Sequence, residues 1–200
     1  MVSKCSDMLS RRVILAALAA IFAFMIGPWL LLWAQRSAAP QKLAPYVRTP
    51  QDVVERMLAL AEVGPKDVVY DLGCGDGRLV ITAAKKYGAR GVGVDFDLDR
   101  VKESQANAKI AGVETLVDFK HQSALDVDVS PATVVTLYLL SESNLQLRPI
   151  LTKVLAPGSR IVSHQFSMGN WTPEKKLTFN DSEGSARILY LWRTDGNVRP

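Results

Sequence analysis

The clearest feature of the hydrophobic pattern is an uncharged stretch near the N-terminus. Residues 13–34 carry no charged side chain, and as a helix they would extend roughly 33 Å, enough to cross the hydrocarbon core of a bilayer. Gly27-Pro28 would kink this helix, which membrane helices tolerate, and Trp29 and Trp33 lie near its end, where indoles favour the interface. The pattern predicts a transmembrane helix over residues 13–34 after a short tail, residues 1–12.

Two other interpretations of this stretch stay open. The segment Ser10–Leu15 resembles a twin-arginine export signal. However, the apolar run is long for a signal peptide, and Pro40 follows the best small-residue cleavage site at residues 37–39. A core helix that is apolar on all sides would need a larger protein to bury it. An uncleaved anchor is favoured. The numbers of basic residues before and after it are about equal, so the positive-inside rule does not decide its orientation.

After a linker, residues 35–45, amphipathic stretches alternate with short apolar runs, which predicts one α/β domain over residues 46–196. Thr49 and Asp52 suggest a capping box, and Asp97 and Ser141 suggest N-caps. The order of elements predicts a mostly parallel sheet with helices on both faces and an antiparallel end. The predicted helices are about residues 50–63, 78–87, 98–110 and 141–155, and the predicted strands are 67–71, 91–95, 115–119, 132–139, 160–166, 175–180 and 186–193.

A glycine-rich loop between the first predicted strand and the following helix carries the chemical argument. Its sequence runs from Asp71 through Gly73, Gly75 and Gly77. Glycine lets the backbone turn sharply and approach a ligand closely, and a helix N-terminus presents free N–H groups. Asp95 ends the next strand, where an acid can accept hydrogen bonds from two ribose hydroxyls.

Two cofactor classes use this geometry. Dinucleotide enzymes need a third glycine where this chain has Arg78. The pattern Asp-x-Gly-x-Gly-x-Gly instead resembles the first motif of class I S-adenosylmethionine-dependent methyltransferases, which have a seven-stranded Rossmann-like sheet. The resemblance implies that Asp71 places the methionine end of S-adenosylmethionine, Asp95 holds its ribose, and Phe96 and Ser123 lie near its adenine.

Four blocks narrow the resemblance. Residues 45–50, 71–78, 132–140 and 160–164 occur in the order found in small membrane-associated methyltransferases. The eukaryotic members of that family methylate lysines of the mitochondrial adenine-nucleotide translocase and the ATP synthase c subunit, and this chain is most similar to their prokaryotic relatives. The similarity covers about residues 43–193. The chain departs from the family at Ser123 and, after the fifth strand, where acids are replaced by Gln165, Ser167 and Asn170.

A lysine acceptor must lose a proton, from an ordinary pKa of about 10.4, before it can attack a methyl group. An aromatic, desolvated channel favours this loss, and Tyr46, Tyr138 and Trp171 are candidates to line it. His164 is a candidate base, although a core histidine is the favoured interpretation. No Asn-Pro-Pro-Tyr motif follows the fourth strand, which argues against methylation of amino-purines and glutamine amides. His121, Glu142 and Cys74 have structural interpretations: a structural or solvated histidine, a helix-start charge and a buried loop residue.

The composition argues against several other classes of protein. The chain has 48% hydrophobic and 22% charged residues, which is typical of a globular protein. Of its 24 basic and 20 acidic residues, three and one lie in residues 1–35, so the remainder carries only +2 and shows no basic patch for nucleic acid. Its two cysteines, Cys5 and Cys74, exclude a disulfide scaffold and argue against a four-ligand zinc site.

These observations predict a membrane-anchored S-adenosylmethionine-dependent methyltransferase. By resemblance, its acceptor is a lysine of a membrane protein, and its partners are the bilayer and that substrate rather than nucleic acid. Since the cofactor is made inside cells, the domain is expected to face the cytoplasm, or the matrix if the protein is mitochondrial. The alternatives are a small-molecule or lipid methyltransferase, a non-catalytic assembly factor that binds the cofactor, and a nicotinamide oxidoreductase. The sequence predicts no metal and does not indicate an oligomeric state.

Overall fold

The computed structural model describes residues 43–200. The predicted transmembrane helix, residues 13–34, and most of the predicted linker lie outside the described residues. Within residues 43–200, no helix combines the length and the apolar character needed to cross a bilayer.

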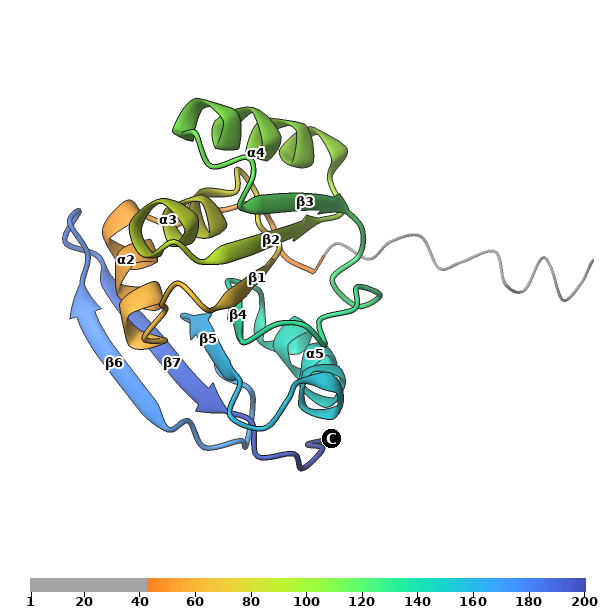
Figure 1. Cartoon of the computed structure of the whole chain (residues 1–200). Coiled ribbons are helices and arrows are strands. Elements are labelled where there is room, and N and C mark those ends of the chain that lie inside the picture. Colours follow the sequence, from red (N-terminus) through yellow and green to blue (C-terminus); the bar gives the residue numbers. More distant parts are fainter. Residues whose placement is uncertain (1–42) are drawn as a thin grey trace, which may run out of the picture. The chain divides into compact units, whose positions relative to one another are not determined.

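The described part of the chain folds into one seven-stranded sheet with helices on its two faces (Figure 1). The helices are α2 (Gln51–Leu60), α3 (Arg78–Tyr87), α4 (Leu98–Ala111) and α5 (Ser141–Val154). The strands are β1 (Val68–Leu72), β2 (Arg90–Asp95), β3 (Val117–His121), β4 (Val134–Leu137), β5 (Arg160–His164), β6 (Lys175–Asn180) and β7 (Ala186–Arg193).

The strand order is β3-β2-β1-β4-β5-β7-β6. Strands β1 to β5 are parallel, and β7 pairs antiparallel with both β5 and β6. The chain moves outward from β1 in one direction through β2 and β3, and then in the other direction through β4 and β5. Ligands of open α/β sheets bind at such a reversal, outside the carboxyl ends of the strands. The fold therefore confirms the predicted Rossmann-like sheet and places its crevice at the ends of β1 and β4.

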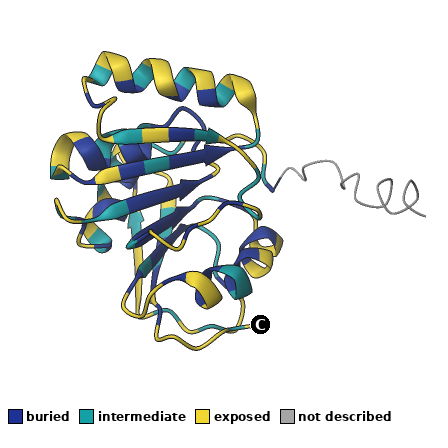
Figure 2. Ribbon diagram, turned by 45° about the vertical axis from the view of Figure 1, so that its right-hand side comes forward, coloured by how far each residue is buried: buried dark blue, intermediate teal, exposed yellow. Residues whose placement is uncertain are grey.

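Two hydrophobic clusters hold the layers together. Side chains of α2, α3 and α4 cover one face of the sheet, and α5 covers the other. The central strands are almost fully buried, whereas α4 keeps an exposed outer face (Figure 2). Burial on both faces explains why β1 and β4 have nearly continuous apolar sequences instead of alternating ones.

The predicted element ends are correct where a local signal sets them and less accurate elsewhere. Helix α3 ends at Gly88, which has φ +69°, and β6 and β7 have the predicted bounds. Strand β3 begins two residues later than predicted because a turn closes before it, with the Leu116 N–H donating to the Val113 carbonyl. Strand β5 ends at His164 because Gln165 adopts φ +69° and leaves the extended conformation.

Two of the three predicted helix caps are wrong. Pro50 is the N-cap residue of α2, with no side-chain cap, and Asp52 instead accepts hydrogen bonds from Ser182. Ser141 is the first residue of α5, after Leu140, and its side chain makes no capping bond. Only Asp97 caps as predicted, by accepting a hydrogen bond from the backbone of α4. The Asp52 side chain thus bonds to Ser182, which is distant in sequence, instead of to the backbone at the start of α2.

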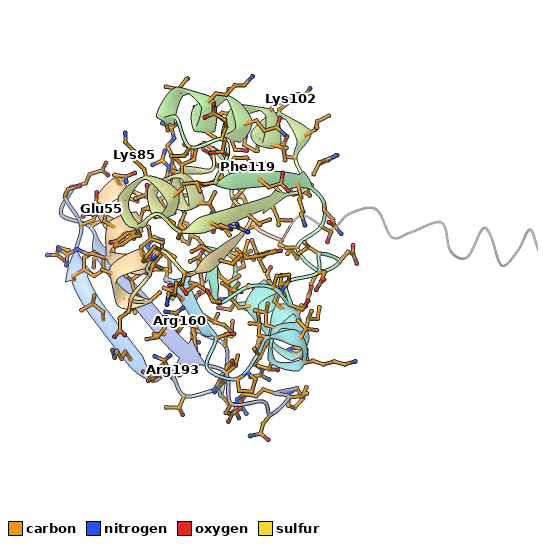
Figure 3. The ribbon with its side chains drawn as sticks, viewed as in Figure 1. Glu55, Lys85, Lys102, Phe119, Arg160 and Arg193 are labelled. Atoms are coloured by element: carbon orange, nitrogen blue, oxygen red, sulfur yellow. The ribbon has the colours of Figure 1, made fainter. Side chains whose placement is uncertain are left out.

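Gly77 provides a test of the packing behind the glycine loop. It has φ +78°, and a Cβ there would lie 2.7 Å from the side chains of Phe119 (labelled in Figure 3) and Ser104. Gly88 has a similar φ but open surroundings, its nearest neighbour lying at 3.6 Å. We expect Gly88→Ala to cost about 1 kcal/mol of strain and Gly77→Ala about 1–3 kcal/mol more from overpacking. Denaturant unfolding of both variants measures the difference, and equal costs would contradict it.

Candidate active site

The main pocket lies where the topology predicts it, at the carboxyl ends of β1 and β4. Its floor comes from the glycine loop, the end of β2 and the end of β4. A segment that precedes α2, Leu43–Thr49, crosses the pocket and contributes seven consecutive residues to its lining; we call it the strap. Val54 and Met57 of α2 add an apolar wall.

The glycine loop is held against β2 by backbone hydrogen bonds. The N–H groups of Gly73 and Cys74 both donate to the Val94 carbonyl, at 2.8 and 3.0 Å. Gly73, Gly75 and Gly77 all have positive φ, at 86°, 53° and 78°. Gly73 and Gly75 line the pocket, whereas Gly77 does not: it starts α3 and turns the chain into it. The loop therefore offers bare backbone to whatever occupies the pocket.

Asp95 joins β2 to this loop. One carboxylate oxygen accepts from the Gly75 N–H at 2.9 Å, and the other accepts from the Asp97 N–H at 3.0 Å. The side chain is buried and lines the pocket. A carboxylate has about four acceptor positions, so two amide donors leave it able to accept ribose hydroxyls as well. Phe96 and Ser123 line the pocket beside it.

Asp71 is the most perturbed acid of the pocket. Burial raises its pKa to about 7, and the nearby carboxylates of Asp95 and Asp76 add to the rise. The Thr136 hydroxyl donates to it at 2.7 Å and partly opposes this effect. A buried acid beside other acids is destabilised when it ionises, so this position favours a cationic ligand group.

Ionic contacts tie the strap to the glycine loop. Arg78 donates from Nε and Nη2 to Asp76, at 2.9 and 2.6 Å, and its Nη1 donates to the Thr49 carbonyl at 2.6 Å. Arg48 lies 3.3 Å from the same carboxylate. Burial alone would raise the pKa of Asp76, but the hydrogen bonds and charge of Arg78, aided by Arg48, lower it below its ordinary value. Asp76 therefore stays ionised and secures the pocket wall.

Tyr46 and Tyr138 approach the pocket from two directions. A Cβ on Gly75 would meet the Tyr46 ring at 2.4 Å, so the ring lies directly on the loop backbone, with the Arg100 guanidinium 4.9 Å from its centre. Tyr138 follows β4 and lines the pocket. Both predicted tyrosines therefore lie at the pocket.

His164 does not line the pocket. It is fully buried on β5, with its ring 4.0 Å from that of Tyr138. Among residues 43–200, neither ring nitrogen has a hydrogen-bond partner. Burial, and then the charge of Arg187, lower the pKa of His164 to about 4, against an opposing effect of Asp181. This placement agrees with a core histidine that supports Tyr138 from behind.

Trp171 corrects a prediction. It does not line the pocket; it packs against Trp192, with the two rings 5.9 Å apart, and its carbonyl accepts from the Trp192 indole. The remaining structural interpretations agree with the structure. Cys74 is buried, which raises the pKa of its thiol, His121 contacts the Phe96 carbonyl at 2.8 Å, and Glu142 is exposed at the start of α5.

Sequence reasoning missed several residues of the pocket. Arg48 and Arg100 line it, and the buried Thr136 supports Asp71 from behind the lining; these tertiary contacts are not encoded by any local motif. Only Thr136 carried a signal, as the single polar residue of the buried run 134–137. Among residues 43–200, no group of three His, Cys, Asp or Glu side chains is placed to hold a metal.

The domain model described as the ANTKMT methyltransferase domain matches residues 71–175. This chain belongs to that family. A protein-lysine N-methyltransferase of Saccharolobus islandicus is 46% identical over 74% of this chain and 92% of its own length. A human lysine N-methyltransferase, named for the ATP synthase c subunit, is 29% identical over 65% of this chain and 55% of its own length.

A solved structure extends the comparison to the fold and the cofactor. It is the crystal structure of an RNA methyltransferase from Salinibacter ruber in complex with S-adenosyl-L-homocysteine. It shares 50% identity, has a TM-score of 0.72, and covers 76% of this chain and 97% of that one. The protein is an S-adenosylmethionine-dependent methyltransferase, as the glycine loop and its acids predicted.

The Asp71 environment predicts a stability change of known sign. Its folded pKa of about 7 exceeds the ordinary value of about 3.9. The folded state therefore holds a proton that the unfolded state releases between these values. Stability falls as pH rises from 4 to 7, by up to about 1.4 kcal/mol per unit. Above pH 7 Asp71 is ionised in both the folded and the unfolded state, so the loss of folding free energy reaches its full size.

Asp71→Asn removes this charge while its amide oxygen can still accept from Thr136. We expect the ligand-free variant to be more stable than the natural protein at pH 8, on the order of 3 kcal/mol, and nearly equal at pH 4.5. Denaturant titrations at the two pH values measure this. A variant that is less stable at pH 8 would show that Asp71 is not raised in pKa.

Proposed function

We propose that this enzyme transfers a methyl group from S-adenosylmethionine to the amine of a lysine side chain in a protein. The observation that carries the proposal is the pair of tyrosine rings, Tyr46 and Tyr138, that approach the cofactor pocket from the strap and from β4. Aromatic faces attract ammonium groups, and a desolvated channel lowers the pKa of an amine so that its lone pair becomes available. The Saccharolobus relative, a protein-lysine N-methyltransferase, supports the same acceptor.

The residues of the pocket fit the cofactor. Asp71 is a buried carboxylate suited to the ammonium of its methionine end, and Asp95 keeps acceptor positions for the ribose. A Cβ at Gly75 would collide with the Tyr46 ring, so the absence of a side chain lets the strap pack closely on the loop beside the pocket. When bound, S-adenosylmethionine supplies an electrophilic methyl group on a sulfonium. Since displacement at that carbon is in line, the chain's task is alignment and exclusion of water, which the strap and the wall of α2 can perform.

Among the described residues, the buried acids of the pocket lining are Asp71, Asp95 and Asp76; the first two are assigned to the cofactor and the third is paired with Arg78, so none of them is proposed as the general base. His164 is buried behind Tyr138 and neutral at physiological pH, so we assign it to support of that ring. The acceptor amine is proposed to lose its proton to water as it enters the aromatic channel. The amine nitrogen then forms the new bond to the methyl carbon, while the electron pair of the broken carbon–sulfur bond stays on sulfur.

RNA is the other acceptor to consider, because the Salinibacter relative is described as an RNA methyltransferase. The exposed residues beside the pocket do not favour a polyanion. Arg48 and Asp97 are the exposed charged residues of the pocket lining, and they carry opposite charges. Outside residues 1–35 the chain carries a net charge of only +2, from the composition described above. A protein acceptor agrees better with this mixed surface.

We also propose that residues 13–34 anchor the enzyme in a membrane with its domain on the cytoplasmic side, or in the matrix if mitochondrial. Eight residues, 35–42, separate this segment from Leu43, and they reach at most about 28 Å when fully extended. Leu43 itself lines the pocket. Such a short connection would keep the active site near the bilayer and raise the effective concentration of membrane-protein substrates. A reporter fused after Pro200 that is active only outside the cytoplasm would contradict this orientation.

The cofactor assignment is tested by calorimetric titration of the full chain, in a nonionic detergent, with S-adenosylhomocysteine. We expect Asp95→Ala to weaken binding by about 1.5–3 kcal/mol, tenfold or more, because the ribose loses a charged acceptor. Asp99→Ala, which removes an exposed carboxylate outside the pocket lining, serves as the control and should bind normally. Equal binding by the natural protein and both variants would show that Asp95 does not hold the ribose.

The acceptor is tested by transfer of labelled methyl groups to a membrane extract. We expect the label in protein, removed by protease and recovered as methyl-lysine. Tyr138→Ala should reduce the rate on the order of tenfold or more through loss of the aromatic face, and Tyr138→Phe should retain most of it. Label removed by ribonuclease or extracted with lipid would identify a different acceptor class and overturn the lysine proposal.

A further inference from the structure

Arg148, on α5, is the most buried arginine of the described chain, with 9% of its surface exposed. Its Nη1 donates to the Met168 carbonyl and to the Asn170 side-chain oxygen, both at 2.8 Å. Its Nε is buried and has no partner among residues 43–200. Both of these acceptors are neutral.

The other arginines show how unusual this is. Each half-buried arginine of residues 43–200 forms an ion pair with a carboxylate: Arg78, Arg100, Arg160, Arg187 and Arg199. Arg148 forms none of the ion pairs within the described residues, although it is more buried than any of them. A buried charge without a counter-charge is strongly destabilising, and hydrogen bonds to neutral groups compensate only part of that cost. A carboxylate beside Arg148 would therefore offset a cost that the described residues leave uncompensated.

A second guanidinium reaches the same place. The backbone N–H of Arg199 donates to Thr152, one turn beyond Arg148 on α5, at 2.9 Å. The Arg199 guanidinium lies 4.9 Å from the centre of the Trp171 ring, and its Nε is also buried without a partner in the described chain. Its charge is shared with Asp195. About one positive charge is thus uncompensated, which suits a carboxylate better than a polyanion.

This cationic site adjoins the acceptor side of the pocket. The loop after β5 connects the two, because Phe166 in that loop stacks on Tyr138 with ring centres 6.5 Å apart. Asn144, one turn before Arg148, donates to the Phe166 carbonyl at 3.1 Å and holds the loop on α5. Asn170 is exposed, so an anion can approach from solvent. A protein docked with its lysine at Tyr138 would extend over this loop.

We propose that Arg148, with Arg199 beside it, is an anion-binding site that takes a carboxylate side chain of the methyl-accepting protein. The proposal rests on the proposed function, since it assumes a protein acceptor. It assigns Arg148 to substrate recognition, outside the cofactor pocket.

The site is tested with Asn170→Asp in the full chain, in a nonionic detergent. This variant places a carboxylate on the residue that already contacts Nη1. We expect its thermal midpoint at low ionic strength to rise by about 3 °C or more. The natural protein should be stabilised by sodium acetate beyond sodium chloride of equal ionic strength, and Asn170→Asp should lose that difference. Asn180→Asp, an exposed position on β6, controls for net charge. An unchanged midpoint with an unchanged acetate response would overturn the proposal.

The substrate role is tested with labelled methyl transfer to the membrane extract. Because its internal carboxylate competes with that of the substrate, Asn170→Asp should raise the extract concentration needed for half-maximal rate on the order of tenfold. Its maximal rate and its affinity for S-adenosylhomocysteine should be unchanged. An unchanged concentration dependence would overturn the substrate role. So would a stabilising effect of phosphatidylserine vesicles that only Asn170→Asp abolishes, which would assign the site to lipid.

These outcomes are separate from failure of the proposed function. If the natural protein does not bind S-adenosylhomocysteine, or labels no protein, the methyltransfer proposal fails whatever the Asn170→Asp variant does. If it binds and labels protein, but Asn170→Asp behaves as the natural protein does, only the Arg148 site fails.

Discussion

The hydrogen bond from the Gly75 N–H to Asp95 holds the active site together. It joins the loop after β1 to the end of β2, and it adds to the two backbone hydrogen bonds that this loop makes with the Val94 carbonyl. Because Gly75 is fixed, the Tyr46 ring has a surface to rest on, and the strap can close over the pocket. The same carboxylate is the proposed ribose acceptor. In that proposal one side chain both shapes the loop and would contact the ligand, so the loop is preorganised before the cofactor binds.

Local signals account for most of what the sequence predicted. Helix α3 lies between Gly77 and Gly88, and both glycines have a left-handed backbone that ends helical periodicity on its own. The closing strands β6 and β7 were predicted with their true limits from their apolar patterns. The caps at Thr49 and Ser141 failed for the opposite reason. Each has a plausible local pattern, but Asp52 bonds to Ser182, which is 130 residues away in sequence.

The cofactor side of the site was more predictable than the acceptor side. Asp71, Gly75 and Asp95 belong to one motif and its following strand, so their spacing alone brings them together. The acceptor side is built by contacts between α5, the loop after β5 and the strap. Periodicity does not encode which aromatic residue turns toward the pocket, and Trp171 was therefore placed there wrongly. Arg148 gave no sequence signal, because only the fold shows that its side chain makes no ion pair with a carboxylate of residues 43–200.

The buried carboxylate of Asp71 has a consequence for the lifetime of the protein. Its ionised form destabilises the ligand-free fold at physiological pH, and the ammonium of S-adenosylmethionine, in the proposed position, would offset that destabilisation. A ligand that binds only the folded state adds stability in proportion to the logarithm of its concentration. With the cofactor in the proposed position, the folded fraction of the enzyme would therefore rise with the supply of S-adenosylmethionine, and a low supply would leave more of the chain open to proteases.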